Sequence, residues 1–68
     1  MTSNEYDTLL HKGTLLRHIR VDGIYMYLGE NYMHHPEYNT HNIYAFKQKR
    51  LLDNVETQYL IRSFVILK

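Results

Sequence analysis

Hydrophobic and polar residues alternate on both sides of Asp22-Gly23, and this alternation predicts two β-strands joined by a tight turn. Asp-Gly favours a two-residue hairpin turn because glycine adopts the positive φ angle that such a turn requires. We therefore expect residues 14–20 to pair with residues 24–29, with Asp22-Gly23 at the centre of the hairpin. This hairpin is the element around which we expect the other strands to assemble.

Aliphatic and aromatic residues alternate in the second strand of this hairpin. The period of two predicts that the aliphatic side chains face the core and that the tyrosines between them face outward. The same alternation returns at residues 42–51, where aromatic residues alternate with lysines, and it predicts another strand with a buried aromatic face. Together with the last part of the chain, the predicted core comprises Ile24, Met26, Leu28, Tyr44, Phe46, Ile61 and Phe64.

The two ends of the chain are less regular. Residues 1–11 predict either a short helix, capped by Ser3 or Asn4, or a frayed tail. Asp53-Asn54 is a turn signal, and residues 55–68 predict one or two further strands. The hydrophobic parity shifts near residues 62–63, which predicts a bulge or a single 3₁₀ turn there.

This pattern predicts an all-β fold, namely a small SH3-like barrel of four to five strands over residues 12–68, preceded by the segment 1–11. Five short motifs occur in this order along the chain: Gly13, Arg17-His18, Ile24-Tyr25, Tyr44 and Ile61-Arg62. In this order the chain resembles a family of small, uncharacterised SH3-like domains from bacteria and phages. Those domains have a Gly…Arg-His strand, then an apolar-Tyr strand, then an apolar-Arg-Pro stretch. The chain departs from them at Ser63, where proline is expected, and at the insert of residues 30–41.

Composition excludes several functions. The 68 residues carry eight Lys/Arg and seven Asp/Glu, and this near-balance argues against a nucleic-acid binder that relies on overall charge. No apolar run is long enough for a membrane helix and residues 1–11 do not look like a signal peptide, so we expect a cytoplasmic protein. Without a cysteine nucleophile or a glycine-rich phosphate loop, we expect neither an enzyme nor a bound cofactor.

Residues 30–41 are the strongest candidate for function. They have no hydrophobic period and contain Pro36, so they predict a long connection rather than a central strand. Tyrosine offers a large apolar face with a polar tip, which suits a contact surface. We expect a small non-catalytic protein-binding module, either an adaptor or an inhibitor. The predicted partner-binding residues are Tyr32, Met33, His34, His35 and Tyr38.

The histidines and the basic residues raise two other possibilities, a zinc site and a nucleic-acid interface. His34, His35 and His41 are potential zinc ligands, but they lack a regular ligand spacing, so we predict no metal site. A nucleic-acid-binding barrel is the alternative function. It would use the basic residues Lys47, Lys49 and Arg50, with the two lysines on one strand face beside aromatic side chains.

Overall fold

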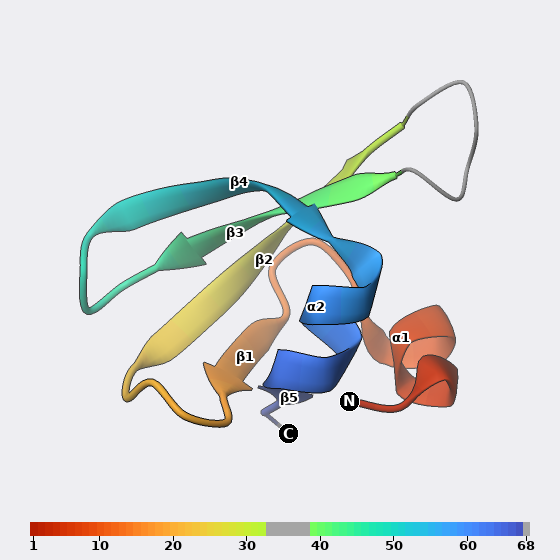
Figure 1. Cartoon of the computed structure of the whole chain (residues 1–68), viewed down its shortest axis with the longest axis horizontal. Helices are drawn as coiled ribbons and strands as arrows, with labels where there is room; N and C mark the ends of the chain where they lie inside the picture. Colours follow the sequence, from red (N-terminus) through yellow and green to blue (C-terminus); the bar gives the residue numbers. More distant parts are fainter. Residues whose placement is uncertain (33–38, 68) are drawn as a thin grey trace.

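The computed structural model describes residues 1–32 and 39–67. Five antiparallel strands form one open sheet in the order β4-β3-β2-β1-β5, and two short helices pack against it (Figure 1). The sheet therefore has β4 at one edge and β5 at the other. The elements are α1 (Ser3–Leu9), β1 (Leu15–His18), β2 (Ile24–Asn31), β3 (Thr40–Ala45), β4 (Arg50–Glu56), α2 (Thr57–Ser63) and β5 (Phe64–Ile66).

The predicted hairpin is present, but its turn is wider than expected. Strands β1 and β2 are antiparallel, and their last pair joins Arg17 to Ile24. Gly23 has a φ of +123°, so the expectation of a positive angle is confirmed. Ile19 does not pair with β2 as predicted, because its N–H donates to the carbonyl of Ser63 at 2.9 Å, on the other side of β1. The connection therefore leaves the sheet after His18 rather than at Asp22.

The predicted faces of β2 are reversed. Tyr25 and Tyr27 are only 4% and 6% exposed, whereas Ile24 is 46% exposed. A tyrosine can be buried when its hydroxyl finds a hydrogen-bond partner. Tyr27 meets this condition, because its hydroxyl lies 2.8 Å from Nδ1 of the buried His41. The larger aromatic side chains therefore fill the core, and the aliphatic ones lie on the outer face of the sheet.

The strand predicted over residues 42–51 is in fact two strands and a turn. Strand β3 ends at Ala45 and β4 begins at Arg50, with a turn at residues 46–49. Lys49 adopts a φ of +53°, which interrupts extended backbone. Phe46 stands in this turn and is 43% exposed, so its predicted burial is wrong. Its ring packs edge-to-face on Tyr44, with the centroids 5.3 Å apart.

The observed core lies between the inner face of the sheet and the helices. Of the predicted core residues only Phe64 belongs to it, because β2 and β3 bury the opposite parity. Helix α2 contributes Leu60, and the partly buried side chains of Met1 and Tyr6 pack against the edge of this cluster. The buried hydrophobic residues are Leu16, Tyr25, Tyr27, Ile43, Ala45, Leu60, Phe64 and Ile66.

Helix α1 confirms one of the two alternatives predicted for residues 1–11, although its N-cap differs, and helix α2 was not predicted. Helix α1 forms rather than a tail, and its N-cap is Thr2, which makes a capping box with Glu5. The amino group of Met1 donates to the carbonyl of Ile61 at 2.8 Å and to that of Phe64, which ties the chain start to α2 and β5. Helix α2 occupies residues for which we expected a strand with a bulge or one 3₁₀ turn.

Candidate functional site

The loop predicted to bind a partner is only partly described. Tyr32 follows β2 and is 82% exposed, so its ring is available for contact. Met33, His34, His35 and Tyr38 lie outside the described residues. Their predicted role in partner binding stays a prediction.

Lys47 and Lys49 do not share a strand face as predicted. Both lysines lie in the turn between β3 and β4. Lys47 donates to Asp22 at 3.1 Å, so part of its charge is compensated. The Lys47 side chain also packs on the backbone of Gly23, where an added Cβ would lie 3.2 Å from the Lys47 Cβ. Arg50 is the first residue of β4, and its side chain lines a groove, which neither lysine does.

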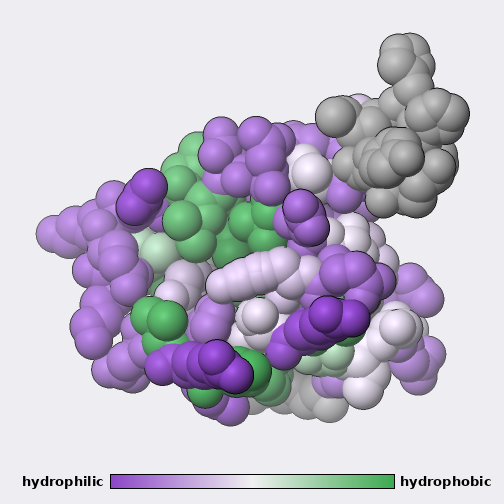
Figure 2. Space-filling view, in the orientation of Figure 1, coloured by the Kyte–Doolittle hydropathy of each residue, from purple (hydrophilic) through white to green (hydrophobic). Residues whose placement is uncertain are grey.

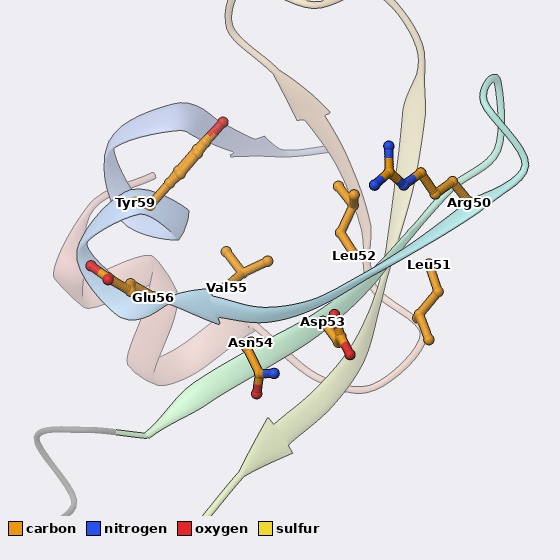
Figure 3. A pocket seen from close by; sticks show the side chains of 8 residues that line it. All are labelled: Arg50, Leu51, Leu52, Asp53, Asn54, Val55, Glu56 and Tyr59. Atoms are coloured by element: carbon orange, nitrogen blue, oxygen red, sulfur yellow. The ribbon is translucent and has the colours of Figure 1, made fainter.

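This groove lies between β4 and α2 and has a volume of about 530 Å³. Its lining runs along β4 from Arg50 to Glu56 and includes Tyr59 of α2. In Figure 3, the side chains of Leu52 and Val55 project from β4 toward the side on which Tyr59 stands. Figure 2 shows hydrophobic surface beside β4 with polar side chains around it. The groove therefore combines apolar walls with a polar border, and its size is within the range of ligand pockets.

A β-bulge explains why Leu52 and Val55 share one side of β4. Leu52 pairs with Ile43 and Val55 pairs with His41, so β4 contains one more residue than β3 between these pairs. Asn54 adopts a φ of +56° within the bulge, and its side chain accepts a hydrogen bond from Thr40 Oγ1 at 3.2 Å. The turn predicted at Asp53-Asn54 is wrong, because both residues lie within β4. The spacing of three between Leu52 and Val55 was the signal for the bulge.

A buried chain of hydrogen bonds joins β4's neighbour β3 to the start of α2. Thr57 Oγ1 donates to the carbonyl of Asn39 at 3.3 Å, so it accepts from His41 Nε2 at 2.8 Å. The Nδ1 atom of His41 is then the acceptor for the Tyr27 hydroxyl. Burial lowers the pKa of His41, and burial with the nearby charge of Glu30 raises the pKa of Tyr27. His41 is therefore a neutral structural residue that fixes where α2 begins.

A second histidine holds Tyr59 in place. His18 Nδ1 accepts the N–H groups of Arg20 and Val21, at 3.0 and 3.1 Å. Nδ1 is therefore unprotonated, and the proton on Nε2 is donated to the Tyr59 hydroxyl at 3.0 Å. The Tyr59 ring also contacts the rings of His18 and Phe64, each with a centroid distance of 6.1 Å. Tyr59 is 43% exposed, yet these contacts fix its orientation.

The described residues contain neither a metal-binding cluster nor a membrane-spanning helix. Within residues 1–32 and 39–67, no three His, Asp or Glu side chains come together as a metal site requires. Neither of the two described helices is long and apolar enough to cross a membrane. The histidines considered as zinc ligands are divided: His41 has hydrogen bonds at both ring nitrogens, and the other two lie outside the described residues.

Comparisons with known proteins do not assign the chain to a family. No protein-family model, curated protein or solved structure matches it. The resemblance to SH3-like domains therefore stays a prediction. What the structure shows is a small β-rich fold with one open antiparallel sheet.

Proposed function

We propose that the chain is a small non-catalytic protein-binding module, acting as an adaptor or inhibitor, in which the groove between β4 and α2 receives an extended segment of a partner. The observation that carries this proposal is Tyr59, which is half-exposed and lies across the groove from Leu52 and Val55, with its hydroxyl bonded to His18 and its ring against Phe64. Preorganised aromatic side chains beside apolar walls are typical anchors of protein contacts, because little conformational entropy is lost on binding.

The position of β4 in the sheet supports the same proposal. Strand β4 is an edge strand, and within residues 1–32 and 39–67 it pairs only with β3. An extended partner segment can add hydrogen bonds to the main chain of such an edge while its alternate side chains enter the neighbouring groove. The bulge at Asp53-Asn54 divides β4 into two short regular stretches, residues 50–52 and residues 55–56. The partner segment therefore binds short stretches of main chain and depends on its side chains for most of its affinity.

The fold itself is part of the proposal. Consecutive antiparallel strands, with β5 returning to pair with β1 after a short helix, support an SH3-like barrel as the scaffold. In this arrangement α2 stands beside the edge strand β4 and contributes Tyr59 to the groove. The scaffold thus places the aromatic ring of Tyr59 beside the edge strand β4.

Nucleic acid is the less favoured occupant of this groove. Asp53 and Glu56 line it together with Arg50, so a phosphate backbone along β4 meets carboxylates as well as one guanidinium. The lysines of the alternative hypothesis lie in the turn before β4, where Lys47 pairs with Asp22. Mixed charge around apolar walls favours a peptide segment.

A displayed library of random peptides provides a test that needs no known partner. Peptides selected on the wild-type chain are expected to shift the backbone amide NMR signals of β4 and α2. Replacing Tyr59 by alanine should weaken their binding at least tenfold, as expected for an aromatic anchor. Tyr32→Ala distinguishes the groove from the loop predicted from the sequence, since it removes an equally large exposed ring outside the groove and should leave binding unchanged if the groove is the site. Enriched peptides that shift other surfaces, or no enrichment at all, would contradict the proposal.

A further inference from the structure

A second hollow lies on the other side of Tyr59, and its lining is basic. It has a volume of about 330 Å³ and is lined by His18, Ile19, Arg20, Tyr59, Arg62 and Ser63. Tyr59 lines both this hollow and the groove along β4, so the two hollows share this residue. A segment bound in the groove can therefore extend one side chain into the hollow.

The two arginines of this hollow have no counter-charge in the described part of the chain. Neither guanidinium makes an ion pair or a side-chain hydrogen bond with a residue in 1–32 or 39–67. Asp22, the acidic residue nearest to Arg20 in sequence, pairs with Lys47. Two unpaired guanidinium groups around one hollow favour an anionic ligand, because their planar donors match a carboxylate in a bidentate geometry.

The hydrogen bonds of His18 make Tyr59 a further donor to this ligand. Because His18 Nε2 donates to the Tyr59 oxygen, the hydroxyl proton of Tyr59 is not used in that bond. Tyr59 makes no other hydrogen bond with the described residues, so this proton can be donated outward. The hollow thus offers two guanidinium groups and one hydroxyl donor.

We infer that this hollow is an acidic-residue pocket that binds the carboxylate side chain of an extended partner peptide, while the neighbouring groove binds apolar residues of the same peptide. This role rests on the proposed function of the groove. We expect the peptide to carry one carboxylate in the hollow and none in the groove. The reason is that the hollow is lined by two arginines, whereas the groove is lined by Asp53 and Glu56. A polyanion that continued from the hollow along β4 would be repelled by these two carboxylates.

The inference can be tested with peptide pairs that differ in one residue. A groove-selected peptide that contains glutamate is compared with its glutamine analogue by titration calorimetry. We expect the glutamate form to bind about threefold to tenfold more tightly, as exposed charge-assisted hydrogen bonds allow. Arg62→Gln should abolish this difference, and Tyr59→Phe should reduce it while keeping the apolar contact. Arg17→Gln, on the neighbouring strand β1 and not in the lining of this hollow, should leave the difference unchanged.

Small anions separate failure of this inference from failure of the proposed function. N-acetylglutamate at constant ionic strength should shift the NMR signals of Arg62 and Tyr59 in the wild-type chain and not in Arg62→Gln. Equal affinity for the glutamate and glutamine peptides would contradict the acidic-residue pocket but not the proposed peptide-binding groove. If N-acetylglutamate causes no shift, the pocket is also overturned. Tighter binding of inorganic phosphate or of an oligonucleotide than of the carboxylate would overturn the assigned ligand class.

Discussion

His41 shows at the residue scale how burial decides the role of a side chain. It is fully buried, and both ring nitrogens have partners that suit the neutral tautomer. In sequence it is one of several histidines near a loop, and nothing in that pattern distinguishes it from the others. The distinction arises because His41 lies within β3 and its side chain is on the inner face of the sheet.

The lowered pKa of His41 predicts a loss of stability in mild acid. Below about pH 6.5 the unfolded chain binds a proton at this histidine that the folded chain excludes, so the free energy of unfolding falls as the pH falls. Asp22 also has a lowered pKa, because of its hydrogen bond to Lys47, but its contribution is lost only near and below its usual pKa of 3.8. Urea denaturation between pH 7.5 and 5.5, with His41→Gln as control, measures the histidine contribution. An equal pH slope in both proteins would contradict the prediction.

Two glycines allow backbone strain to be separated from steric contact. Gly23 and Gly13 both have positive φ angles, but an added Cβ meets Lys47 only at Gly23. Gly13→Ala should therefore cost the conformational strain alone, about 1 kcal/mol, and Gly23→Ala should cost about 1 kcal/mol more. Chemical denaturation of the two variants measures both values. Equal losses would show that the Lys47 side chain moves away without cost.

The strands show at the element scale which parts of the fold were predictable. The hairpin of β1 and β2 and the positive φ of Gly23 are confirmed, whereas the position of Asp22-Gly23 at the centre of a tight turn is not. The faces of β2 were not predictable from alternation, because the tyrosines between the aliphatic residues also have large apolar surfaces and can be buried when the hydroxyl finds a partner. Contacts with distant elements decide the choice, since the Tyr25 ring packs edge-to-face on Phe64 with centroids 5.1 Å apart.

The two phenylalanines test this reversal of the faces. Phe64 is 2% exposed and contacts several rings, so Phe64→Ala should cost about 3–5 kcal/mol of unfolding free energy. Phe46 is 43% exposed and packs mainly on Tyr44, so Phe46→Ala should cost only about 1 kcal/mol. Thermal and urea denaturation of both variants provide the measurement. If Phe46→Ala lowered the free energy of unfolding as much as Phe64→Ala, Phe46 would be a core residue, as the alternation predicted.

At the scale of the whole molecule, the candidate site could not be derived from the sequence because it depends on an element that the sequence did not indicate. Residues 57–63 have an apolar pattern that fits a short strand, and only their helical form places Tyr59 across from Leu52 and Val55. The bulge in β4 is the second requirement. The loop chosen from composition contains Tyr32, but its other predicted contacts lie outside the described residues.

The molecule also has an apolar outer face that no described element covers. A row of directly paired residues crosses four strands there, from Leu51 through Tyr44 and Met26 to Leu15. Both helices pack on the other face, where Leu60 and Tyr6 contact the core. Two residues of this row, Met26 and Tyr44, were predicted from the alternation to lie in the core. The alternation was therefore detected correctly, but one apolar face was mistaken for the other.

This outer face should bind a hydrophobic dye in the folded state. Exposed apolar patches of a few hundred Å² on small proteins are often contact surfaces, and they offer a flat site for anilinonaphthalene sulfonate. Leu51 is 53% exposed within the row, so Leu51→Lys should lower the dye fluorescence and change the free energy of unfolding by less than about 1 kcal/mol. Leu9→Lys is the matched control, because Leu9 is 40% exposed but lies on α1. If both variants lower the fluorescence equally, the dye does not report on this face. If Leu51→Lys unfolds the chain, Leu51 is a core residue, and the outer face is not open.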